Sequence, residues 1–218
     1  MKICGIDPSM NSTALSIIDY ETTELIDYLV FGEIKRIENE HGGDNYRYLK
    51  FDYSDPNKKN FEKFNFIIEN VLDKLIKNNV EYVAIENYAY GANTGSAYQI
   101  GEFVGCLKRE LYNHGFKIRL YEPTIIKMFI TGKGNSSKDI VIKSLLQNFH
   151  FVDKYFSKFE KYKYDLYDSY AIVRLLKKEL DLKNNKNLRM TPLEYKTFTK
   201  KHKKDKVTLL DKEFTCKW

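Results

Sequence analysis

The chain has 218 residues, of which 43% are hydrophobic and 30% are charged, so it can bury one sizeable core and is neither a fibre nor fully disordered. The mean hydropathy is −0.52, and no apolar run approaches the roughly 20 residues that span a bilayer. The first residues lack the apolar stretch of a secretory signal. The three cysteines, at positions 4, 106 and 216, have neither zinc-site nor disulfide spacing. We therefore expect a soluble, cytoplasmic protein with reduced thiols and no membrane association.

The positive charge is concentrated near the end of the chain. The net charge is +6, and residues 183–206 carry nine Lys or Arg against two acids, which gives +7 there and −1 elsewhere. Such a segment binds phosphates by releasing counterions, although a solvated, disordered terminus has the same composition. The sequence predicts a domain over residues 1–182 and a basic extension over 183–218, whose apolar end docks on the core or on a partner.

The predicted elements begin with three strands, over residues 2–7, 13–20 and 24–34. Short polar turns join them, which indicates an antiparallel meander. Residues 35–60 are charged and rich in turn-forming residues, so we predict a long loop or insertion there.

Helices and strands then alternate. Apolar spacing and β-rich runs predict a helix over 61–76, a strand over 80–86, a helix over 97–114, a strand over 117–121, and helices over 137–149 and 165–180. This order is typical of an α/β fold with a mixed five-stranded sheet, three antiparallel strands followed by parallel ones, and helices on its faces.

Four acids occupy notable places on this scaffold. Asp7 and Glu86 each end an apolar strand, and Asp165 and Asp168 are three apart, a spacing that places helical side chains about 5 to 6 Å apart on one face. Converging carboxylates repel one another unless cations hold them, and an all-oxygen ligand set favours Mg²⁺ or Mn²⁺ over Zn²⁺. Two such ions, about 3.5 to 4 Å apart, commonly clamp a phosphodiester. Taken singly, Asp7 is also a turn-former before proline, and the aspartate pair also suits a helix N-terminus.

Five motifs in chain order resemble the RuvC-like Holliday junction resolvases. They are Gly5–Leu15, Ile85-Glu86, Ser96–Gly105, Glu122–Lys138 and Asp165–Ala171. The resemblance covers residues 1–34 and 80–180. It implies an RNase H-like fold, a homodimer that meets through the helix at 97–114, and Mg²⁺-dependent symmetrical nicking of four-way and other branched double-stranded DNA.

The resemblance also implies roles for single residues. Asp7, Glu86, Asp165 and Asp168 would hold two Mg²⁺ ions per site, for which Mn²⁺ substitutes, and Lys138 would lie near the scissile phosphate. Lys138 also suits an exposed lysine after a Ser136 cap. Further DNA contacts are expected at Lys133 and Ser136, and, from charge alone, at Lys200, Lys201, Lys203 and Lys204.

Bacterial members carry a stacking aromatic three residues after the second acid, where this chain has Ala89. Tyr88 or Tyr90 would supply the π face that stacking needs, or both simply pack. Ser9, where the family commonly has Gly, and the longer chain also favour the phage or poxvirus branch.

Three alternatives remain open from the sequence. A flap, branch or packaging nuclease would keep the same site on another substrate. A nucleotide-binding ATPase of the sugar-kinase and actin class shares the Gly-Ile-Asp strand, but a second phosphate loop and an adenosine motif are not found. A DNA-binding module without catalysis does not need four acids.

Overall fold

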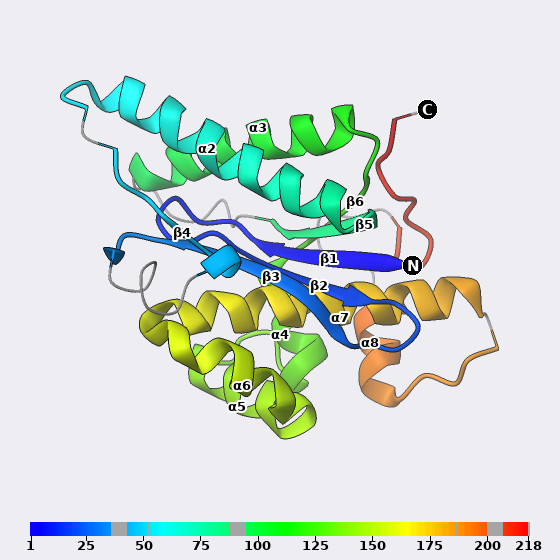
Figure 1. Cartoon of the computed structure of the whole chain (residues 1–218). Helices are drawn as coiled ribbons and strands as arrows, with labels where there is room; N and C mark the ends of the chain where they lie inside the picture. The colour runs from blue at the N-terminus through cyan, green and yellow to red at the C-terminus, as the bar shows by residue number, and fades with distance from the viewer. Residues whose placement is uncertain (36–42, 52, 88–94, 186, 200–206, 218) are drawn as a thin grey trace.

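The computed structural model describes residues 1–35, 43–51, 53–87, 95–185, 187–199 and 207–217 (Figure 1). The strands are β1 (Lys2–Asp7), β2 (Ala14–Asp19), β3 (Leu25–Gly32), β4 (Tyr46–Tyr48), β5 (Val80–Glu86) and β6 (Lys117–Tyr121). The α-helices are α2 (Pro56–Lys77), α3 (Gly95–Asn113), α4 (Pro123–Thr131), α5 (Lys138–Phe149), α6 (Asp153–Phe156), α7 (Lys163–Asn184) and α8 (Pro192–Thr199). Short 3-10 helices lie at Gly43–Asn45, His150–Val152 and Ser157–Tyr162. In this part of the chain no helix combines the length and the apolar character needed to cross a membrane.

The strands form one mixed sheet in the order β4-β3-β2-β1-β5-β6. β1, β2 and β3 pair antiparallel, whereas β1 with β5, β5 with β6, and β3 with β4 pair parallel. The predicted meander and mixed sheet are therefore confirmed. The sheet has six strands instead of five, because β4 forms inside the interval predicted as a loop. Tyr46 of β4 is 1% exposed and packs near Phe159 and Tyr162, which are long-range contacts that a three-residue run does not reveal.

Helices cover both faces of the sheet (Figure 1). α2 and α3 lie on one face, which we call the α2 face, and α4 to α8 lie on the other, the α7 face. In β1, Cys4 and Ile6 are buried on the α2 face, whereas Ile3 is buried on the α7 face. Side chains alternate along a strand, so the two faces have separate apolar cores on either side of β1.

Helix α7 packs directly on β1 at Gly5. A Cβ added there would lie 2.4 Å from the carbonyl oxygen of Ser169 and 2.5 Å from the backbone nitrogen of Val173. Ser16 is the β2 partner of Gly5, and its hydroxyl lies 2.7 Å from that of Ser169. Only a residue without a side chain at position 5 allows this close approach, which brings the start of α7 to the end of β1.

Helices α2 and α4 begin where the sequence pattern had not placed them. α2 starts at Pro56 because the Asp55 side chain accepts a hydrogen bond from the Asn57 amide at 2.9 Å. α4 was not predicted, although it has Pro123 in its first turn and ends at Gly132, which has a φ of 82°. Proline at the start and a left-handed glycine at the end are ordinary helix boundaries.

The apolar end of the chain docks on the core, one of the two outcomes that the sequence left open. Leu209 is 2% exposed and belongs to the core of the α7 face, as does Phe198 of α8. Thr215 pairs with Ile118 of β6. The predicted boundary at residue 182 falls inside α7, and the division into two parts there stays a prediction. Trp218 lies outside the described residues.

The contact between α7 and β1 predicts the effect of adding one methyl group. Gly5→Ala should lower the free energy of unfolding by about 1 to 3 kcal/mol, because the new Cβ overpacks against the α7 backbone. Urea denaturation measures this change. Asn65→Ala at an exposed position of α2 is the control, and it should not destabilise. A Gly5→Ala protein as stable as wild type would contradict the close packing.

Candidate active site

Two acids stand at the carboxyl ends of the neighbouring parallel strands β1 and β5. Asp7 is the last residue of β1 and Glu86 the last of β5, and both are half-buried. Asp7 shares the orientation of Ile3, and Glu86 that of Ala84, which are both buried on the α7 face. Strand alternation therefore points both carboxylates toward α7.

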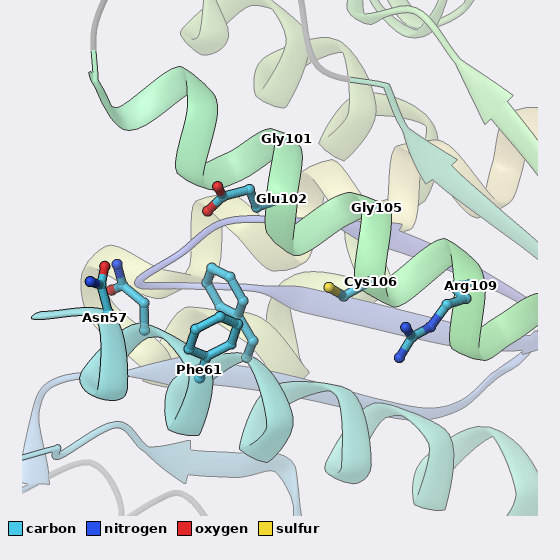
Figure 2. A pocket seen from close by; sticks show the side chains of 9 residues that line it. Asn57, Phe61, Gly101, Glu102, Gly105, Cys106 and Arg109 are labelled. Carbon is cyan, nitrogen blue, oxygen red and sulfur yellow. The ribbon is translucent and has the colours of Figure 1, made fainter.

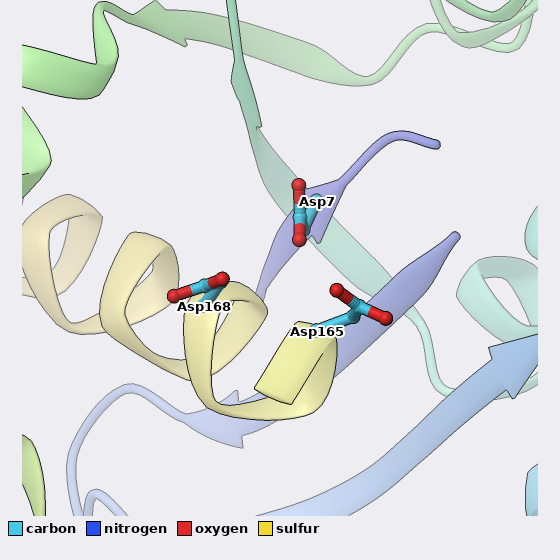
Figure 3. A group of neighbouring side chains, drawn as sticks. All are labelled: Asp7, Asp165 and Asp168. Carbon is cyan, nitrogen blue, oxygen red and sulfur yellow. The ribbon is translucent and has the colours of Figure 1, made fainter. Parts of the chain in front are cut away.

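Helix α7 supplies two more acids to this point. Asp165 and Asp168 lie in its first turns, on the side that meets the end of β1 (Figure 3). One carboxylate oxygen from each of Asp7, Asp165 and Asp168 lies within 4.8 Å of the other two. The Glu86 carboxylate lies outside this tight group but is close enough to raise the pKa of Asp7. We call these four residues the acidic cluster.

The acidic cluster concentrates negative charge in a poorly solvated place. Burial, and then the charges of Glu86, Asp168 and Asp165, hold the pKa of Asp7 well above its usual range. Burial and the charge of Asp168 raise the pKa of Glu86 to about 7. Burial also raises the pKa of Asp165 and of Asp168. Charged carboxylates are costly here unless cations compensate them.

Lys138 provides one such cation from the first residue of α5. Its Nζ lies 2.9 Å from Asp168 Oδ2 and 3.5 Å from Asp165 Oδ1. Burial lowers the pKa of Lys138, but Asp168 and Asp165 outweigh it and raise that pKa to about 12. The lysine therefore stays charged at neutral pH. Ser137, not Ser136, is the residue before α5, and its side chain makes no capping hydrogen bond.

The cluster fits a divalent cation of the Mg²⁺ type. It offers three carboxylate oxygens close enough to share an ion, with a fourth acid beside them. Hard cations of this kind prefer oxygen ligands. The raised pKa values show that burial and mutual repulsion disfavour the charged carboxylates, and a bound cation would relieve that repulsion.

Ser12 and Lys127 act on the cluster and were not singled out from the sequence, and Lys63 contacts the turn that carries Ser12. The Ser12 hydroxyl, in the turn after β1, lowers the pKa of Asp165 by hydrogen bonding. Lys127 of α4 lowers the pKa of Glu86 and of Asp168 by its charge. Lys63 of α2 is 6% exposed, and its Nζ lies 2.5 Å from Asn11 Oδ1 in the same turn. Ser12 and Lys127 lie within the motifs Gly5–Leu15 and Glu122–Lys138, and the signal for Lys63 was a lysine beside the apolar stripe of its helix.

The other predicted DNA contacts lie in different surroundings. Lys133 is exposed beside the turn that leads to α5. Ser136 is 8% exposed and its hydroxyl donates to the Lys133 carbonyl oxygen at 3.0 Å, within that turn. Six others lie outside the described residues, namely Tyr88, Tyr90, Lys200, Lys201, Lys203 and Lys204. The DNA-binding roles of all eight stay predictions.

Comparison with known families gives a match over more than half of the chain. Residues 37–154 match the model of the family described as crossover junction endodeoxyribonuclease RuvC. The matched range contains Glu86 and Lys138 but not Asp7, Asp165 or Asp168, which the fold brings to the same place. No curated protein sequence matches the chain significantly.

Solved structures share the fold at low sequence identity. RuvC of Thermus thermophilus in complex with a Holliday junction substrate is 19% identical, with a TM-score of 0.52 over 79% of this chain and 89% of that one. The yeast mitochondrial Holliday junction resolvase is 13% identical, with a TM-score of 0.51 over 85% of this chain and 81% of that one. The RNase H-like fold of these resolvases is therefore confirmed. The phage or poxvirus branch stays a prediction.

The charge of the cluster predicts how Mg²⁺ changes thermal stability. At a Mg²⁺ concentration about 100 times its dissociation constant, the wild type should gain about 2.7 kcal/mol, or about 5 to 10 °C in Tm. Asp7→Asn should raise the Tm without Mg²⁺, because it removes a buried negative charge, and should lose most of the Mg²⁺ response. Differential scanning calorimetry measures both effects.

The control for this measurement is Asp73→Asn, which removes an exposed acid of α2 that pairs only with Lys77 among the contacts described. It should keep the full Mg²⁺ response. A wild-type Tm that does not change with Mg²⁺ or Mn²⁺ would show that the acids do not form a metal site.

Proposed function

Since the chain belongs to the RuvC family of crossover junction endodeoxyribonucleases, we propose that its acidic cluster is the centre at which it cuts branched DNA. The family makes the chain a junction-resolving endonuclease, which removes the ATPase alternative. The observation that carries the proposal is the convergence of Asp7, Asp165 and Asp168 from two distant segments onto one point. Buried acids without a ligand would only destabilise the fold, so their convergence indicates a functional site.

The four acids of the cluster are the proposed metal ligands. RuvC-like nucleases use divalent metal ions, and we infer that here the ions are Mg²⁺, two per site, with Mn²⁺ able to substitute. Asp7, Asp165 and Asp168 would hold them, and Glu86 would complete the set. When bound, such ions supply Lewis-acid stabilisation of the charge that develops on the scissile phosphate.

Lys138 would meet the phosphate itself. Its ammonium group stays charged, and its side chain is 50% exposed, against 18% for Asp165 and 24% for Asp168. A phosphodiester approaching the cluster would meet four carboxylates, which repel it, and Lys138 and Lys127, which attract it. Placing these two cations on adjacent helices lets the protein bind a polyanion beside acids that alone would exclude it.

A four-way junction is the substrate that we propose, with other branched duplexes also cut. The solved RuvC of T. thermophilus is in complex with a Holliday junction substrate. Flap and packaging nucleases would use the same carboxylate chemistry, so substrate choice depends on surfaces outside the cluster. Tyr88 or Tyr90 at the crossover and the lysines at 200, 201, 203 and 204 are proposed for that role.

Symmetrical nicking needs two equivalent sites, so we propose a homodimer that meets through α3. A hollow of about 540 Å³ lies between α2 and α3, with Phe61, Gly101 and Gly105 among the residues that line it (Figure 2). Phe61 is 65% exposed at its edge. A second copy related by a two-fold axis would bury this ring and present two active sites to one junction.

The nuclease proposal predicts that Glu86→Gln abolishes cutting while leaving DNA binding. The variant removes a ligand charge, so nicking of a synthetic four-way junction in Mg²⁺ should slow by on the order of 100-fold to 1,000-fold or more. Binding in gel-shift assays without metal should be equal or tighter, because a negative charge near the phosphates is lost. Nicked products from junction, flap and linear duplex substrates identify the preferred substrate.

Glu69→Gln, at an exposed position of α2, serves as the control and should cut at the wild-type rate. Full activity of Glu86→Gln would show that Glu86 is structural. No cutting of any branched substrate by the wild type, in Mg²⁺ or Mn²⁺, would refute the proposed activity.

The dimer proposal predicts that Phe61→Glu separates the subunits. Analytical ultracentrifugation should find a dimer for the wild type and a monomer for the variant, since a charge would be buried in an apolar contact. Ile76→Glu is the matched control, because Ile76 is 55% exposed at the other end of the same helix. A wild type that sediments as a monomer with and without junction DNA would contradict the dimer.

A further inference from the structure

The first turn of α7 exposes an aromatic ring immediately before Asp165. Tyr164 is 39% exposed, whereas Tyr167 and Tyr170, which follow on the same helix, are 2% and 0% exposed. The two buried tyrosines pack in the core of the α7 face. Tyr164 is therefore not required by the core, and its ring lies at the surface one residue from a member of the acidic cluster.

Two lysines lie close to this ring. Lys163 Nζ is 5.4 Å and Lys138 Nζ is 5.9 Å from the ring centroid of Tyr164. Lys138 Nζ is also 2.9 Å from Asp168, so one ammonium group is shared between the ring and the acids. Exposed cation–π contacts are worth only about 0.5 to 1 kcal/mol, and a nucleotide base stacking on an aromatic ring gains about 1 to 3 kcal/mol. A base can therefore displace the lysines from the ring.

The surface beside the ring is hollowed. A shallow hollow of about 540 Å³ runs between α5 and the start of α7, and it is lined by Asp139, Ile142, Lys143, Leu146, Gln147 and Tyr164. Ile142 and Leu146 make part of its lining apolar, which suits the face of the sugar of a nucleotide whose base stacks on Tyr164. Asp139 and Lys143, which both line the hollow, are opposite in charge, so the lining itself does not favour a phosphate. Lys163, with Nζ 5.4 Å from the Tyr164 ring centroid, supplies a cation beside it.

We propose that Tyr164 is the stacking platform for the nucleotide next to the scissile phosphate, and that Lys163 contacts the neighbouring phosphate. The inference rests on the proposed function of the acidic cluster. A DNA strand cut at the cluster would pass close to Tyr164, because this residue directly precedes Asp165 and its ring lies 5.9 Å from Lys138 Nζ. An aromatic face, a lysine beside it and an apolar hollow together match the three parts of a nucleotide that a protein can bind: its base, its phosphate and the face of its sugar. The platform would set which phosphate enters the cluster, and so the position of the nick.

The test compares Tyr164→Ala, Tyr164→Phe and Tyr164→Leu on a four-way junction with 2-aminopurine beside the nick site. Binding and fluorescence are measured without divalent metal, and nick positions are mapped in Mg²⁺. Tyr164→Ala and Tyr164→Leu should bind roughly 5-fold to 150-fold more weakly, which is the stacking energy of about 1 to 3 kcal/mol expressed as a ratio. Both should lose the 2-aminopurine signal and spread the nicks over neighbouring phosphates. Tyr164→Phe should behave as wild type, because it keeps the π face.

Tyr53→Ala is the matched control. Tyr53 is 40% exposed and has Lys58 Nζ 4.7 Å from its ring centroid, but it is remote in sequence from the acidic cluster and precedes α2. It should leave binding, fluorescence and nick positions unchanged. Circular dichroism and the Tm identify any variant that fails to fold, and Tyr164→Leu keeps the inference testable if Tyr164→Ala does.

Two results would overturn the platform. One is a Tyr164→Leu protein that binds, quenches and nicks as wild type, which would show that the ring is not used. The other is a Tyr164→Phe protein as defective as Tyr164→Ala, which would assign the effect to the hydroxyl group and not to stacking. A wild type that binds the junction with a 2-aminopurine change but does not cut it would instead refute the proposed function and leave the platform standing.

Discussion

The direct contact of α7 with β1 at Gly5 determines where the acids lie. With no side chain at position 5, the carbonyl oxygen of Ser169 and the amide nitrogen of Val173 lie only 2.4 and 2.5 Å from where a Cβ would stand, far inside van der Waals contact. The paired hydroxyls of Ser16 and Ser169 hold the helix over β2 as well. Because α7 cannot move away without opening the buried core of that face, its first turns are held against the end of β1. The distance from Asp165 and Asp168 to Asp7 is thus a consequence of core packing.

The same packing creates an electrostatic cost that the rest of the site offsets. Burial raises the pKa values of all four carboxylates, and the charges of neighbouring acids add to it for Asp7, Glu86 and Asp168. Uncompensated, these acids would weaken the fold. Lys138 from α5 and Lys127 from α4 partly balance them. Both lysines lie on helices that pack outside the sheet, and Lys138 pairs directly with Asp165 and Asp168. A site that is unfavourable without a ligand is one that metal and DNA can stabilise.

The end of the chain is anchored at the β6 edge of the sheet. Arg119 of β6 is 2% exposed, pairs with Glu179 of α7 at 2.6 Å, and donates to the carbonyl oxygens of Lys212 and Glu213. Lys183, at the end of α7, donates to the carbonyl oxygens of Leu210 and Lys212. These buried bonds tie the last segment to α7 and β6, and a lost partner would leave a charge unpaired in the core. The predicted basic extension, residues 183–218, therefore contains residues that hold α7 in place.

The sequence by itself determined the local features of this protein. Strand alternation, the three-residue spacing of Asp165 and Asp168, and an acid at each of two strand ends indicated an α/β fold with converging acids, because each depends on neighbours within a few residues. The family resemblance of the motifs then favoured a metal site over turn-forming and helix-terminal roles for these acids. Tertiary structure alone decided that β4 joins the sheet, that the last residues dock on β6, and that Tyr164 lies beside Lys138, which the family resemblance had placed near the scissile phosphate. Those outcomes depend on contacts between segments 16 or more residues apart, as Val30 of β3 and Tyr46 of β4 are, and no local pattern encodes such a distance. The close approach at Gly5 belongs to the same class, since a glycine after a cysteine in a strand carries no sign of the helix that will lie on it.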